Sequence, residues 1–158
     1  KVFLSIHVNA NKNKKASGFE TYLLRPGKTD AAVAVAEMEN AVIKLEKNTD
    51  QYDKLSAEQL ILATMAQSSF MQQSETLADL TQREFDKKLV GQNRGVKQAG
   101  FIVLIGASMP NVLIELGFIS NKNDARRLKQ ASYRQKAAQG IFDALMKYKT
   151  RHEKLLSP

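Results

Sequence analysis

The stretch Val112–Asn121, which reads VLIELGFISN, constrains the fold most strongly because it places a single acid inside an apolar strand. Moving a carboxylate out of water is costly unless a hydrogen-bond network, a cation or a metal ion compensates for the lost hydration. The apolar neighbours on both sides of Glu115 predict a buried position. We therefore expect this acid to have a compensating partner elsewhere in the fold.

A second apolar strand, Val2–Ala10, opens the chain with the sequence VFLSIHVNA. Both of its alternating faces are mostly apolar, which is typical of a central strand buried on two sides. This strand carries His7, which is either a hydrogen-bonded core residue or a metal ligand. A polar loop over residues 11–18 follows, at the end of the strand where α/β sheets place their sites. An acid and a histidine in two buried strands indicate a hydrolytic metal site.

Two interpretations of Glu115 compete. It could form a salt bridge with one of the many lysines, or it could act as a general base. Its apolar neighbours favour the second interpretation, because a desolvated carboxylate is suited to taking a proton from water activated by a metal.

The rest of the chain predicts strands mixed with long helices, which indicates a layered α/β fold. Further strands are predicted over residues 19–24, 101–105 and 112–116, and a loop over residues 91–95. Helices are predicted over about residues 30–47, about residues 56–88, and from residue 132 onward. The apolar stripe expected for the first helix is Val35, Met38, Val42 and Leu45, and the stripe expected for the last is Ala138, Ile141, Phe142, Leu145 and Tyr148. We expect a mixed, mainly parallel sheet flanked by helices.

Composition limits the class of protein. A chain of 158 residues fits one domain, residues 1–158. The absence of cysteine excludes a disulfide framework and a thiolate zinc site. The net charge of +8 is compatible with anionic partners such as nucleic acid, wall polymer or lipid headgroups, although on charge alone a solvated basic surface is the preferred explanation. No apolar run approaches the ~20 residues of a membrane span.

The chain begins at the edge of a strand, with neither an initiator methionine nor a signal peptide. We therefore expect it to be the carboxy-terminal portion of a longer protein.

Four blocks of sequence carry a resemblance to a known family. They are Phe3–Ala10, Gly18–Tyr22, Arg94–Leu104 and Met109–Asn121, which read FLSIHVNA, GFETY, RGVKQAGFIVL and MPNVLIELGFISN. In this order, and over nearly the whole chain, they resemble the zinc-dependent N-acetylmuramoyl-L-alanine amidases, the cell-wall amidases that separate bacterial daughter cells. The resemblance implies a hydrolase that uses zinc-activated water to cleave the amide between N-acetylmuramic acid and L-alanine in peptidoglycan.

The resemblance also implies roles for individual residues. His7 matches the second histidine ligand of the family's zinc, and Glu115 matches the catalytic glutamate. The family's other two ligands, a histidine and a glutamate, precede the strand on which this chain begins. The one other histidine, His152, lies in the polar tail and has no feature of a ligand. Because a catalytic zinc takes three protein ligands, this stretch either belongs to a longer chain or has lost its metal.

A helical insert over residues 28–76 is the second functional clue. Such an insert can simply add a stabilising layer. However, Glu39 lies near the expected apolar stripe, whereas Glu37 points away from it. The division amidases have a helix that occludes the active site and offers a glutamate to the zinc. By this resemblance Glu39 is the candidate inhibitory ligand, with Glu37 as the alternative, and a partner would have to pull the helix away.

The resemblance further implies a periplasmic or secreted protein that meets peptidoglycan and an activator protein of the division machinery. The alternative is a regulatory module that has lost its metal and binds wall glycan through its basic surface. A nucleic-acid-binding domain ranks last, because aromatic residues are few and tryptophan is absent.

Overall fold

The computed structural model describes residues 1–25, 29–41, 68–105 and 107–156. Its centre is a sheet of four strands, β1 (Phe3–Asn9), β2 (Phe19–Leu24), β3 (Asn93–Ala99) and β4 (Asn111–Phe118). The strands lie in the order β1-β4-β2-β3. The β1–β4 and β2–β3 pairs are parallel and the β2–β4 pair is antiparallel. The prediction of a mixed, mainly parallel sheet is thus confirmed.

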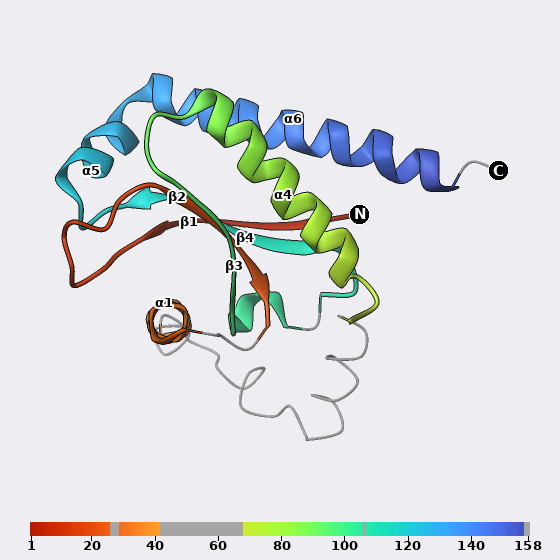
Figure 1. The fold of residues 1–158 in the computed structure, drawn as a ribbon, viewed down its shortest axis with the longest axis horizontal. Coiled ribbons are helices and arrows are strands. Elements are labelled where there is room, and N and C mark those ends of the chain that lie inside the picture. The colour runs from red at the N-terminus through yellow and green to blue at the C-terminus, as the bar shows by residue number, and fades with distance from the viewer. Residues whose placement is uncertain (26–28, 42–67, 106, 157–158) are drawn as a thin grey trace, which may run out of the picture.

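Helices cover both faces of the sheet (Figure 1). Helices α4 (Met71–Lys88) and α6 (Ala131–Leu156) pack together over one face, and the short α5 (Lys122–Lys129) leads from β4 into α6. Helix α1 (Asp30–Asn40) and the 3-10 turn η2 (Ile102–Leu104) lie on the opposite face. Each face has its own apolar core, which is the layered α/β arrangement that the sequence predicts.

Strand β4 is the central strand of this arrangement and is apolar on both sides. Val112 and Ile114 belong to the core under α4 and α6, whereas Leu113 belongs to the core under α1. Because side chains alternate along a strand, Glu115 falls on the α1 face together with Leu113.

Strand β1 was expected to be central, and this expectation is wrong for the described part of the chain. In the described sheet β1 is an edge strand that pairs only with β4. Ile6 is accordingly 55% exposed and Val8 is 38% exposed. The sequence could not distinguish a central strand from an edge strand, because an apolar strand has the same sequence pattern whether one or two strands pair with it.

The expectations for residues 91–105 are also wrong. The predicted loop at 91–95 runs into strand β3, and the predicted strand at 101–105 contains the 3-10 turn η2. Strand β3 has the sequence NRGVKQA, whose charged residues hide its strand character. The apolar residues after it do not extend the sheet. Phe101 and Leu104 are fully buried in the core under α1.

The helices are confirmed with different ends and partly different faces. Helix α1 begins at Asp30 as expected, but its buried residues are Ala32, Val35 and Ala36, and Met38 is 37% exposed. Val42, Leu45 and the expected start of the next helix at Ser56 lie outside the described residues. Much of the insert predicted over residues 28–76 lies outside them too.

Helix α6 packs through part of its expected stripe, because Ile141, Leu145 and Tyr148 belong to the core that it shares with α4. In α4, Leu77 and Phe85 are fully buried. In α6, Ala137 and Ala144 are buried, whereas the expected Ala138 and Phe142 face solvent. No helix in the described ranges is long and apolar enough to cross a membrane.

Candidate active site

The topology brings His7, Glu20 and Glu115 together on the α1 face of three adjacent strands. His7 pairs with Glu115 in the parallel β1–β4 ladder, and Glu20 pairs with Glu115 in the antiparallel β2–β4 ladder. Residues paired across strands have side chains on the same face, about 5 Å apart at Cβ. The predicted histidine and the predicted acid are therefore neighbours.

Glu115 is completely buried, and neither of its carboxylate oxygens has a hydrogen-bond partner among the described residues. The lysine salt bridge considered from the sequence is absent from the part of the chain that the structure describes. Burial, followed by the nearby charges of Glu39 and Glu20, raises the pKa of Glu115 to about 9. An unpaired buried carboxyl of this kind is where a cation or a reacting water would be accommodated.

Helix α1 places Glu39 directly on His7. Glu39 Oε2 lies 2.6 Å from His7 Nδ1, and the two side chains are 16% and 31% exposed. The helix begins at an amino-terminal cap, where Thr29 Oγ1 accepts a hydrogen bond from the backbone nitrogen of Ala32. Glu37, the alternative acid, is exposed. Of the two glutamates, Glu39 is the one that reaches the histidine.

One ligand-type atom from each of His7, Glu39 and Glu115 lies within 4.8 Å of the other two. One imidazole nitrogen and two carboxylates form a donor set that suits zinc. The unpaired oxygens of Glu115 are consistent with a cation at this point. The residues present therefore fit a metal ion. His152, in contrast, is far along the chain in α6 and stacks on Tyr148.

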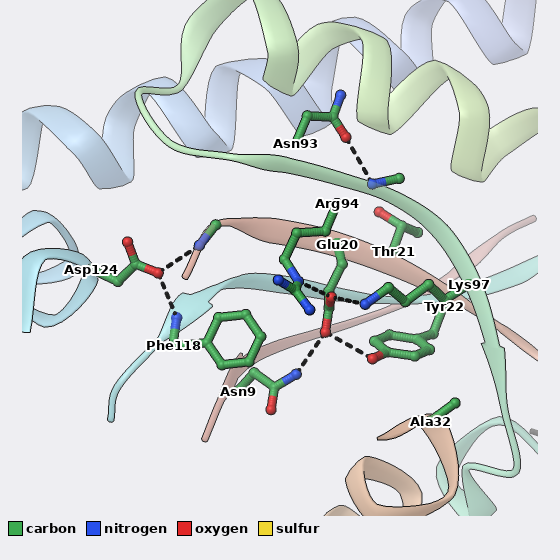
Figure 2. Close-up of polar contacts among 12 residues, drawn as sticks. Asn9, Glu20, Thr21, Tyr22, Ala32, Asn93, Arg94, Lys97, Phe118 and Asp124 are labelled. Carbon is green, nitrogen blue, oxygen red and sulfur yellow. Dashed lines mark hydrogen bonds and ion pairs between the residues drawn. The ribbon is translucent and has the colours of Figure 1, made fainter. Parts of the chain in front are cut away.

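A second buried acid, Glu20, was missed from the sequence. It is 1% exposed, and its carboxylate accepts hydrogen bonds from Asn9 and Tyr22 at Oε1 and from Arg94 and Lys97 at Oε2 (Figure 2). Burial by itself would raise the pKa of Glu20, but the hydrogen bonds from Lys97 and Arg94 outweigh it and lower that pKa. The sequence pattern could have predicted its burial, because Glu20, like Glu115, is an acid inside a short, mostly apolar strand.

Asp124 fixes the strand ends next to this site. Its Oδ2 accepts hydrogen bonds from the backbone nitrogens of Gly18, at 2.8 Å, and Phe118, at 3.1 Å (Figure 2). Gly18 has φ +103°, and a Cβ there would lie 2.0 Å from the carbonyl oxygen of Gln92. Only glycine fits this position, so the tight entry into β2 requires Gly18.

Comparison with known proteins identifies the family. A family model described as N-acetylmuramoyl-L-alanine amidase matches residues 1–147. The chain belongs to this amidase family. It is 34% identical over 147 residues to the N-acetylmuramoyl-L-alanine amidase LytC of Bacillus subtilis, covering 93% of this chain and 21% of LytC. It is 31% identical over 151 residues to the amidase AmiA of Escherichia coli, covering 93% of this chain and 51% of AmiA. The chain thus spans about half of AmiA and about a fifth of LytC.

Solved amidase structures share the fold. The CwlD amidase of Clostridioides difficile, solved in complex with the GerS lipoprotein, superposes with a TM-score of 0.60 at 24% identity, over 94% of this chain and 54% of CwlD. The catalytic domain of the amidase CwlV from Bacillus (Paenibacillus) polymyxa gives a TM-score of 0.60 at 23% identity, over 93% of this chain and 56% of that domain. The α/β fold described above is therefore that of amidase catalytic domains.

Proposed function

We propose that this chain forms part of a zinc-dependent peptidoglycan amidase that cleaves the amide between N-acetylmuramic acid and L-alanine. The observation that carries the proposal is the buried, unpaired carboxylate of Glu115 beside His7 and Glu39. The named amidases that match most of the chain support the reaction class.

His7 would be one protein ligand of the zinc. A zinc ion held there would polarise the scissile carbonyl and lower the pKa of a water molecule. Glu115 takes a proton from the attacking water and then gives it to the nitrogen of the leaving L-alanine, so that the peptide departs as a neutral amine. The apolar surroundings raise the pKa of Glu115, and a zinc ion beside it would lower that pKa again. The carboxylate could then accept a proton in the first step and release it in the second.

Glu39 would hold the site closed. In the described state its carboxylate occupies the side of His7 that faces α1, where a ligand or water would otherwise bind. We infer that activation requires a partner protein that shifts the population toward a state with α1 withdrawn. The CwlD structure contains a lipoprotein partner, which is a precedent within the fold. A peptidoglycan amidase would act outside the cytoplasm, in the periplasm or after secretion.

The experiment replaces Glu115 by alanine in the full-length product of the gene, with Glu37→Ala as a matched control on an exposed acid. Zinc content is measured by atomic absorption, and peptide release is measured from purified cell-wall sacculi. We expect Glu115→Ala to retain zinc and to lose peptide release by at least about a thousandfold, while Glu37→Ala keeps both. Activity in Glu115→Ala would remove this residue from the mechanism, and a wild-type protein without zinc would favour the non-catalytic glycan-binding module.

A further inference from the structure

Glu20 gathers two cations at one carboxylate. Arg94 Nε lies 2.7 Å and Lys97 Nζ 2.5 Å from Oε2, and Figure 2 shows them approaching the carboxylate from different directions. One negative charge is therefore shared by two positive charges. This cluster of Glu20, Arg94 and Lys97 carries a net charge of about +1 at neutral pH, so it favours a further anion.

The side chain of Arg94 is held in one orientation, and part of its hydrogen-bond donor capacity is unused among the described residues. Its Nε donates to Glu20, and its guanidinium lies over the ring of Phe118, with 5.1 Å from Cζ to the ring centroid. Within the described part of the chain, the two terminal amino groups of this guanidinium have no hydrogen-bond partner. The side chains of Arg94 and Lys97 remain 27% and 31% exposed. The terminal donors are thus oriented by the protein and accessible from solvent.

The cluster borders the candidate active site. Glu20 pairs with Glu115 across β2 and β4, and Asn9, two residues beyond His7, donates to Glu20. Strand β3, which carries both cations, is two strands from β4, or about 10 Å at the usual strand spacing. Two residues of extended peptide span about 7 Å. A substrate peptide that begins at Glu115 can therefore bring its second residue within reach of the Arg94 side chain.

We propose that Arg94, assisted by Lys97, binds a carboxylate of the stem peptide next to the scissile bond. The second residue of such a peptide is a D-glutamate joined through its side chain, which leaves its α-carboxylate either free or amidated. A guanidinium pairs with a carboxylate through two parallel, charge-assisted hydrogen bonds that a neutral amide cannot match. Arg94 would therefore select the free acid over the amidated form. This inference rests on the proposed function for its choice of ligand.

The test measures binding separately from cleavage. Two soluble probes, N-acetylmuramoyl-L-alanyl-D-isoglutamate and its D-isoglutamine counterpart, are titrated into the full-length protein by calorimetry. The proteins are the wild type, Arg94→Gln and the control Arg83→Gln, whose arginine lies on α4 in an exposed pair with Asp79. Each of these three proteins is also prepared with the additional substitution Glu39→Ala. A failure to bind caused by α1 covering the site can then be distinguished from the absence of a carboxylate site.

We expect the wild type and Arg83→Gln to bind the acid probe about tenfold more tightly than the amide probe. In Arg94→Gln this preference should fall to less than about twofold. Equal binding of the two probes by the wild type, binding of neither probe in either background, or a preference that survives Arg94→Gln would overturn the proposal.

Two controls keep the result interpretable. Thermal unfolding checks that Arg94→Gln is folded, and Lys97→Gln and Arg94→Lys replace it if it is not, with a reduced preference expected in both. Cleavage of the probes is recorded independently. A protein that prefers the acid probe but cleaves neither probe contradicts the proposed function and supports the carboxylate site, whereas equal binding with normal cleavage contradicts only the carboxylate site.

Discussion

Glu20 and Glu115 lie opposite each other on neighbouring strands and are both buried, yet their environments push their pKa values apart. Burial tends to raise the pKa of Glu20, but hydrogen bonds from Lys97, Arg94 and Tyr22 outweigh it and lower that pKa. Glu115 has no such partners among the described residues, so burial raises its pKa to about 9. Pairs of acids separated in this way are typical of sites in which one carboxyl organises the structure and the other transfers protons.

Replacing Glu39 by alanine tests whether its contact with His7 restrains the enzyme. The 2.6 Å hydrogen bond exists only when α1 is docked, so its loss should shift the population toward the open state. We expect basal peptide release, without any activator, to rise about tenfold in Glu39→Ala. Glu37→Ala is the control, because Glu37 is exposed on the same helix. Unchanged release in Glu39→Ala would show that the contact has only a structural role.

Helix α1 is held against the domain at its carboxyl end by a second contact. Asn40 Nδ2 donates to the carbonyl oxygen of Gly100, and Asn40 Oδ1 accepts from the backbone nitrogen of Ile102, both at 2.9 Å. The side chain thus satisfies one donor and one acceptor of the segment that joins β3 to η2. This contact lies one residue beyond Glu39, so it fixes the turn of the helix that reaches His7.

We therefore expect Asn40→Ala to loosen α1 without touching the site chemistry. The loss of two hydrogen bonds, each worth about 1 kcal/mol, should raise basal peptide release several-fold. It should also increase amide hydrogen exchange in residues 30–40, measured by mass spectrometry. Basal peptide release by the double variant Glu39→Ala/Asn40→Ala should be only slightly higher than that of either single variant, because α1 is already mostly open in each of them. If Asn40→Ala leaves exchange in α1 unchanged, this contact does not hold the helix.

Helices α4 and α6 are joined by a buried acid with several cations around it. The side chain of Glu84 is 4% exposed and lies within ion-pair distance of Lys87, Lys88 and Lys147. Hydrogen bonds from Lys147 and Lys87 lower the pKa of Glu84 to about 2. Since the pKa is lower in the folded state, this acid stabilises the fold above about pH 4.5, and the contribution is lost as the pH falls from there toward 2.

Replacing Glu84 by glutamine should therefore lower the free energy of unfolding by about 1 kcal/mol at pH 7, a modest value because the lysines are partly solvated. The difference from the wild type should shrink below pH 4.5 and disappear near pH 2. Denaturant unfolding at several pH values measures it. Asp79→Asn, which removes an exposed pair with Arg83, should have a smaller effect. A difference that stays constant with pH would contradict the ionic origin of the stabilisation.

For the molecule as a whole, the proposed metal would link the α1 face to the sheet. A ligand that binds only the folded state stabilises it by about 2.7 kcal/mol at a hundred times its dissociation constant. We expect a chelator to lower the thermal unfolding midpoint of the full-length protein by several degrees, and added zinc to restore it. His7→Ala should lose this response, whereas Glu37→Ala should retain it. A midpoint that is insensitive to chelator in the wild type would argue against zinc at this site.

Much of the fold follows from local pattern. The limits of β2 and the apolar, two-sided character of β4 could be predicted because buried strands need apolar residues. Strand β3 could not, because its Arg94 and Lys97 are accommodated inside the fold by ion pairs with Glu20, which lies 74 and 77 residues earlier in the chain. The edge position of β1 in the described sheet was also beyond prediction, since strand order depends on long-range pairing.

Three properties of the site follow from neighbouring residues in the sequence: Glu115 is a buried acid, His7 lies in an apolar strand, and Glu39 is near the inner side of a helix. Two further properties depend on tertiary contacts: these three groups meet within 4.8 Å, and Glu20 is neutralised while Glu115 is not. The pKa of an ionisable group depends on burial and on every nearby charge and hydrogen bond. Strand pairing and helix docking bring those neighbours together from distant parts of the chain.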